Sequence, residues 1–155
     1  MEQKTEILPA IALRGLTVLP GMIIHFDISR EKSIAALEKA MVGSQRVFLI
    51  TQKQGEIQEP EREDLYSVGC IAVAKQLVKL PEHVIRVMVE GLERAQLIHL
   101  DTEGSYFLAE TEKLIPASEL EPLDYITTEA MVRMVKDKLE EYARINPRMI
   151  KEVLP

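Results

Sequence analysis

The stretch from Val68 to Leu100, VGCIAVAKQLVKLPEHVIRVMVEGLERAQLIHL, decides the fold of this 155-residue chain. Two apolar runs rich in β-branched residues, 68–78 and 84–90, flank the sequence LPEH at 80–83, which is typical of a hairpin connection. Gly91 separates the second run from a further one at 95–100, so it either closes a tight turn or allows a bulge that bends one long strand. The stretch therefore predicts antiparallel strands and leaves the geometry at Gly91 open.

Shorter strand patterns lie on both sides of this stretch, at 7–13, 22–28, 46–52 and 106–114. Pro20-Gly21 and the segment 101–105, which contains Gly104, are turn signals. Pro9 indicates an edge or bulged strand, because proline has no N–H to donate to a central ladder. Many short strands at this spacing favour a small barrel or sandwich over a parallel βαβ architecture.

One helix is expected among the strands. Ser29 is its candidate N-cap, and Gly43 is placed to end it as a left-handed C-cap residue. Between them, apolar residues recur at helical spacing: Ile34, Leu37, Ala40 and Met41. The fold class is therefore α+β and mainly β, with one inserted helix.

A second, longer amphipathic helix is expected at 120–145, with Pro122 near its first turn and an exposed Glu129–Arg133 pair. Its apolar face either folds back on the strands or belongs to a helical region that the chain does not contain. Because a further helix-like stretch at 148–154 stops at Pro155, we favour the second alternative. We expect one domain at 1–118 and the start of a helical region at 119–155.

Composition and motifs exclude several classes of function. The formal charge is −6, and residues 59–155 carry 12 basic and 19 acidic residues, which argues against binding to a phosphate backbone. No apolar run approaches the length of about 20 residues that a membrane span needs. The single cysteine, Cys70, excludes an internal disulfide and reads as a buried, inert thiol in an apolar strand. There is no phosphate-binding loop motif, no serine-elbow motif and no local metal-ligand spacing, so we expect no catalytic residue, no metal and no cofactor in this chain.

Several segments together resemble the N-terminal domain of the Lon ATP-dependent protease family. The opening LPAIALR at 8–14 is similar to that family's Leu-Pro-x-x-Pro-Leu-Arg, with Ala12 in place of a usual proline. His25 also stands where the family commonly has a proline. The other matching segments follow in order: 18–22 (VLPGM), 29–33 (SREKS), 36–41 (ALEKAM), 65–69 (LYSVG), 79–81 (KLP) and 87–95 (VMVEGLERA).

The resemblance implies a small PUA-like β-barrel, followed by a helical region, an ATPase module and a serine–lysine protease module. The last two are absent here, so the chain looks like the substrate-engaging end of a cytoplasmic hexameric protease whose ATP and Mg belong to the missing module. The family's domain helps to select and hold unfolded or degron-bearing proteins, and it supports assembly of the hexamer. For this fragment we expect a monomer or weak dimer that contacts no membrane and no nucleic acid.

Two other functions stay open. One is a stand-alone domain of the same family that acts as a non-proteolytic ligand or degron receptor, and the other is an RNA-binding module, since PUA-like barrels occur in RNA-modifying proteins. The candidate substrate-binding residues lie at a loop rim and just after Gly91: Arg14, Pro20, Gly21, Met22, Glu93 and Arg94. A simpler reading gives Pro20, Gly21 and Gly91 a role in backbone geometry, and makes Glu93–Arg94 an ordinary surface pair.

Overall fold

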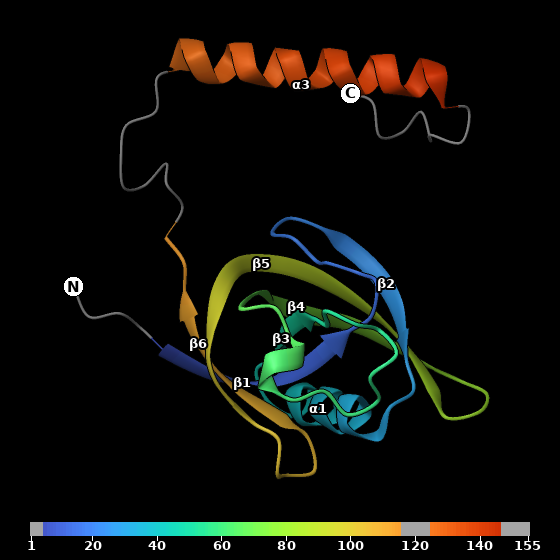
Figure 1. The fold of residues 1–155 in the computed structure, drawn as a ribbon. Helices are drawn as coiled ribbons and strands as arrows, with labels where there is room; N and C mark the ends of the chain where they lie inside the picture. The colour runs from blue at the N-terminus through green and yellow to red at the C-terminus, as the bar shows by residue number, and fades with distance from the viewer. Residues whose placement is uncertain (1–4, 116–124, 147–155) are drawn as a thin grey trace. The chain divides into compact units, whose positions relative to one another are not determined.

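The structure is a computed structural model that describes residues 5–115 and 125–146 (Figure 1). The chain divides into two compact units, 1–114 and 115–155. The first holds six strands and two helical segments: β1 (Thr5–Leu13), β2 (Ile23–Ile28), α1 (Glu31–Met41), β3 (Arg46–Thr51), the short 3₁₀ helix η1 (Arg62–Asp64), β4 (Val68–Leu80), β5 (Val84–Asp101) and β6 (Phe107–Lys113). The second holds α3 (Tyr125–Ile145).

The six strands form one sheet that closes on itself. Their order is β2-β5-β4-β3-β1-β6, and β6 also pairs with β5, so β5, β4, β3, β1 and β6 make a ring with β2 attached outside it (Figure 1). β1 and β3 are parallel, and the other pairings are antiparallel. The predicted mainly β fold with an inserted helix is confirmed, and its barrel takes the form of this ring.

The decisive stretch forms the longest hairpin of the fold. β4 and β5 pair from Leu80↔Val84 to Val68↔Gln96 around the predicted turn at 81–83. At Gly91 the bulge alternative is the correct one, because Ile71 pairs with Glu93 while the next residue, Ala72, pairs with Gly91. The extra residue lets one 18-residue strand bend and serve both β2 and β6.

Alternating side chains of the ring strands build two cores. Phe48 and Ile50 of β3 belong to the core inside the ring, here called the ring core, with residues of β1, β4, β5 and β6. Val47 and Leu49 belong to the helix core, which Leu37 and its neighbours on α1 cover. Because both faces of β3 are buried, its sequence reads as a continuous apolar run rather than an alternating one.

Both predicted caps of α1 are wrong. The N-cap is Arg30 rather than Ser29, and it makes no side-chain capping hydrogen bond. Gly43 is not left-handed. The chain instead makes a further turn after Met41 and adopts the left-handed conformation at Gln45 (φ 64°), whose N–H donates to Ala40 O, directly before β3 begins.

The sequence predicts an edge or bulged strand at Pro9. β1 is not an edge strand, but Pro9 itself pairs on one side only. β1 lies between β3 and β6, but its pairing with β3 starts only at Ala10. Pro9 therefore pairs with Leu108 of β6 on one side and has no ladder partner in β3 on the other. That is where a residue without an N–H costs least.

The second unit contains the predicted long helix. The predicted start of this helix at residue 120, the domain boundary between 118 and 119 and the helix-like stretch at 148–154 all lie outside the described residues. The Glu129–Arg133 pair is confirmed, with 3.1 Å between Arg133 Nη2 and Glu129 Oε1. The apolar side chains of α3 are largely exposed, Ile126, Met134 and Val135 among them.

Candidate functional site

The predicted Pro20-Gly21 turn is present, and it projects from the end of β2. Met22 N–H donates to Leu19 O at 3.1 Å, and Gly21 has φ +85°. Proline followed by a residue with positive φ is the signature of a type II turn, which requires glycine at its third position. Pro20 and Gly21 are exposed, and Met22 is half-buried.

This turn is fixed to the bulge of β5. Gly21 N–H donates to Gly91 O at 2.9 Å, and Gly91 N–H donates to Met22 O at 2.8 Å. A Cβ on Gly91 would lie 2.2 Å from Leu19 O, so only glycine allows this approach. The backbone role that the sequence suggested for Gly91 and Gly21 is therefore real, and it holds an otherwise protruding turn in place.

Large apolar side chains are exposed around the fixed turn. Leu19 is 45% exposed, Ile23 65% and Leu92 38%. Together with Pro20 and Met22 these residues are here called the Pro-Gly rim. A cluster of exposed apolar side chains on a hydrogen-bonded backbone is typical of a surface that binds another molecule.

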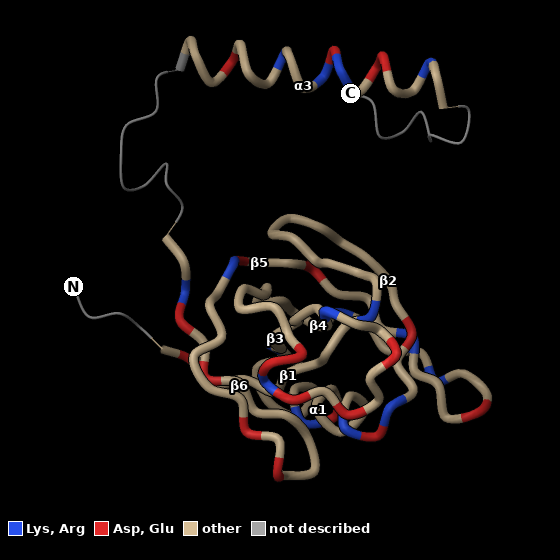
Figure 2. The backbone as a smooth tube through the Cα atoms, in the orientation of Figure 1, with Lys and Arg blue, Asp and Glu red and all other residues tan. Residues whose placement is uncertain are grey.

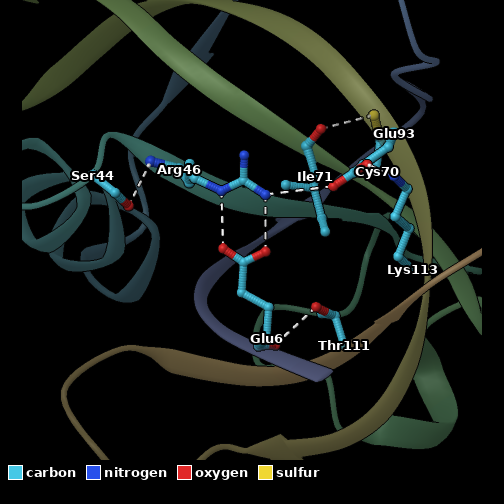
Figure 3. Close-up of polar contacts among 8 residues, drawn as sticks. All are labelled: Glu6, Ser44, Arg46, Cys70, Ile71, Glu93, Thr111 and Lys113. Carbon is cyan, nitrogen blue, oxygen red and sulfur yellow. Dashed lines mark hydrogen bonds and ion pairs between the residues drawn. The ribbon is translucent and has the colours of Figure 1, made fainter. Parts of the chain in front are cut away.

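Glu93 forms ion pairs with two basic side chains. It accepts from Lys113 Nζ at 3.0 Å and from Arg46 Nη2 at 3.5 Å, while Arg46 makes a two-point contact with Glu6 at 2.9 and 2.8 Å (Figure 3). The hydrogen bond from Arg46 to Glu6 is the main cause that raises the pKa of Arg46. Arg94 is exposed, and its carbonyl accepts Leu114 N–H. The expected Glu93–Arg94 surface pair is thus replaced by a network across four strands.

The network closes one end of the ring core. Glu6, Arg46 and Glu93 have the same alternation as Leu8, Phe48 and Ala95, which are core residues of the same strands. Thr111, fully buried beside them, donates to Glu6 O at 2.8 Å (Figure 3). Glu93 therefore takes part in a network that links β1, β3, β5 and β6 at this end of the fold.

Arg14 lies at the opposite end of β1, beside a residue that sequence reasoning did not select. Arg14 Nη2 donates to Gln58 Oε1 at 3.0 Å. Arg30 is half-buried and donates to Gln52 Oε1 at 2.6 Å, to Ala12 O and to Gln58 O. Burial lowers the pKa of Arg30, and the positive charge of Arg14 lowers it further.

Gln52 organises the loop that follows β3. Only 4% of it is exposed, and its Nε2 donates to Gln54 O at 3.1 Å and to Ile57 O at 2.9 Å. The signal that could have drawn attention to this end was a polar residue closing an apolar strand run, together with the SREKS segment at 29–33. The sequence shows both features, but no local pattern indicates that Gln52 and the segment 29–33 lie side by side in the fold.

Cys70 is buried, as predicted, and burial is the main cause that raises the pKa of its thiol. Among the described residues no group of three or more histidine, cysteine, aspartate or glutamate side chains is placed to hold a metal ion. Within the same residues, no helix is long and apolar enough to cross a membrane.

The fold and the rim together define a small β-ring domain with an exposed apolar surface. A model of the ATP-dependent protease La (LON) substrate-binding domain matches residues 7–155, and the chain belongs to this family. It is 45% identical over 155 residues to the Lon protease of Lachnoclostridium phytofermentans, covering 99% of this chain and 19% of the relative. It is 43% identical over 148 residues to the Lon protease of Clostridioides difficile, with 95% and 19% covered. The chain thus spans about a fifth of the length of these relatives.

Solved structures agree on the fold. The N-terminal domain of Mycobacterium avium complex Lon protease superposes with a TM-score of 0.70 at 20% identity, covering 90% of this chain and 68% of that one. A Lon N-terminal domain protein from Xanthomonas campestris gives a TM-score of 0.58 at 14% identity, with 84% and 73% covered.

Proposed function

We propose that this chain is the substrate-engaging domain of a cytoplasmic ATP-dependent serine protease, and that it holds unfolded or degron-bearing polypeptides through the Pro-Gly rim. Membership of the substrate-binding domain family supports the assignment, and the exposed apolar rim on a fixed backbone is the observation that carries the location. Pro20, Gly21 and Met22 then belong to the binding surface. Glu93 supports the fold behind it.

The longer protein supplies what this chain lacks. ATP and Mg act in its ATPase module, proteolysis in its protease module, and the chain itself binds without catalysis. A hexamer brings six rims together, so weak contacts at each add up through effective concentration. The isolated fragment is then a monomer or weak dimer, with a domain boundary at 118/119.

Nucleic acid is not the expected partner. Figure 2 shows acidic residues interspersed with basic ones along the ring unit, without the continuous basic stripe that phosphate backbones require. The non-proteolytic receptor alternative uses the same rim, and the sequence of the full gene distinguishes the two: a nucleotide-binding motif downstream supports the protease.

The test is binding of denatured casein to the isolated chain and to a tethered hexamer of it, followed by fluorescence anisotropy. Ile23→Thr removes apolar surface from the rim, while Val78→Thr makes a matched change at another exposed strand position, in β4. At about 0.8 kcal/mol per buried methylene, we expect Ile23→Thr to weaken binding roughly three- to tenfold. Val78→Thr should leave it unchanged. Equal effects of the two variants, or no binding by the hexamer at high micromolar concentration, would contradict the proposal.

A further inference from the structure

A second concave feature lies away from the rim, where the ends of β1 and β2 meet the N-terminus of α1. It is a pocket of about 150 Å³. Its walls come from two segments and one helix residue: Ala12, Leu13, Arg14 and Leu16; Phe26, Asp27, Ile28, Ser29 and Arg30; and Ser33.

The charged residues that line the pocket, Arg14, Arg30 and Asp27, give it a net positive charge. Arg14 and Arg30 donate only to neutral acceptors, the side chains or carbonyls of Gln58, Gln52 and Ala12. Within residues 5–115, neither makes an ion pair with a carboxylate. Asp27, the acid in the wall, is already held by Arg86 at 2.8 and 3.1 Å.

The electrostatics of Arg30 agree with this geometry. Burial and the nearby Arg14 both lower its pKa, so the surroundings disfavour its charged form. A bound anion would oppose both effects, because it would accept hydrogen bonds from the guanidinium groups and offset their positive charges.

Ser33 adds a donor of a different kind. It is only 7% exposed and lines the pocket. It belongs to the first turn of α1, an 11-residue helix without a side-chain N-cap, whose free N–H groups also favour an anion. The hydroxyl, the helix end and the two guanidinium groups thus offer the donors that a carboxylate accepts.

The remaining wall is apolar and limits the size of the ligand. Ala12, Leu13, Leu16, Phe26 and Ile28 line it. A cavity of about 150 Å³ admits a group such as benzene. The pocket therefore suits a carboxylate that carries one apolar group of leucine or phenylalanine size.

We infer that this pocket receives the C-terminal residue of a bound polypeptide, with the free carboxylate between Arg14, Arg30 and Ser33 and an apolar side chain against Leu16 and Phe26. A chain terminus is the part of a polypeptide that offers both groups within one residue. The inference deepens the proposed function and rests on it, since it names which feature of the substrate this second site reads.

The experiment compares two decapeptides of one sequence ending in leucine, one with a free C-terminus and one amidated, by amide-NMR titration of the 155-residue chain. We expect the free acid to bind at least tenfold more tightly and to shift the resonances of Arg14 and residues 29–33. Equal affinities of the two peptides would overturn the inference. If equal affinities came with shifts at the Pro-Gly rim, the proposed function would still stand. No binding of either peptide would overturn the inference, and the binding of denatured casein to the tethered hexamer would then test the proposed function separately.

Two further arms separate the source of the carboxylate and the role of the residues. 4-Methylpentanoate carries the same acid and side-chain size without a peptide, and binding as tight as that of the free-acid peptide would assign the pocket to small organic acids and overturn the inference. Arg14→Gln and Ser33→Ala should each reduce the preference for the free acid at least threefold. Arg144→Gln, a matched loss of an exposed arginine in α3, should not. An equal loss in all three variants would count against the pocket.

Discussion

The two ends of the ring differ in the partners of their charged side chains. Because β1 and β3 are parallel, their first residues lie at one end and their last at the other. At the first end Glu6, Arg46, Glu93 and Lys113 pair with one another (Figure 3). At the other end Arg14 and Arg30 donate to neutral groups beside a pocket. Paired charges close a core, whereas charges left without a counter-ion mark a place where a ligand can bind.

The largest effect on stability is expected from breaking the paired end. Arg46→Met leaves Glu6 and Glu93 as two like charges without their shared partner. A fully buried pair broken in this way costs about 3–5 kcal/mol. Because 28% of the Arg46 side chain, 39% of Glu6 and 27% of Glu93 are exposed, we expect about 2 kcal/mol. Urea unfolding of the 155-residue chain measures it. A fall in the free energy of unfolding of less than about 0.5 kcal/mol would show that the ion pairs do not stabilise this end of the ring.

A smaller loss is expected from the hydroxyl behind the network. Thr111→Val keeps the shape of a fully buried side chain but removes the donor to Glu6 O. A net hydrogen bond contributes about 1 kcal/mol, so the free energy of unfolding should fall by about that amount. Thr5→Val, in β1, makes the same change at an exposed strand position and should change it little. Equal effects at the two positions would contradict the claim that the hydrogen bond from Thr111 to Glu6 O stabilises this end of the ring core.

At the other end, Arg14→Gln should leave stability within about 0.5 kcal/mol of the parent, because Arg14 is exposed and donates to one neutral partner. Its effect should fall on binding of the free-acid peptide instead. If Arg14→Gln destabilised the chain as much as Arg46→Met does, both arginines would stabilise the fold. The contrast between the two ends of the ring would then be wrong.

The smallest effect concerns Cys70, whose Cα pairs with Arg94 beside the paired end. Burial raises the pKa of its thiol above the ordinary 9.0, so folding favours the protonated form. The contribution of the thiol to stability is therefore complete below the unfolded pKa and is lost as pH rises through the folded one. Urea unfolding between pH 7 and pH 10 should show a decline that Cys70→Ala lacks. If the free energy of unfolding fell equally in the parent chain and in Cys70→Ala, the Cys70 thiol would not be the cause of the pH dependence.

Local signals in the sequence were sufficient for most of the fold. The turn at 81–83, the Pro20-Gly21 turn and the buried strand 46–51 each depend on residues within a few positions of one another. The helix caps failed because the candidates at Ser29 and Gly43 compete with tertiary contacts, and the side chain of Arg30 is drawn across to Gln52 and Ala12.

The candidate site was predictable only in part, for the same reason. Pro20, Gly21 and Met22 form a local turn, so their exposure at a rim followed from the sequence. Arg46 meets Glu6 across 40 positions, and Arg30 meets Gln52 across 22. Partnerships at that separation follow from strand order and register, which no local pattern specifies.

The most direct test of the central claim is an amide-NMR titration of the 155-residue chain with an unfolded polypeptide whose C-terminus is amidated. We expect shifts concentrated at residues 19–23 and 90–92, while the resonances of Glu6, Arg46 and Lys113 stay in place. Shifts centred on the paired end, or spread evenly over the ring, would contradict a binding surface built on the fixed Pro-Gly turn.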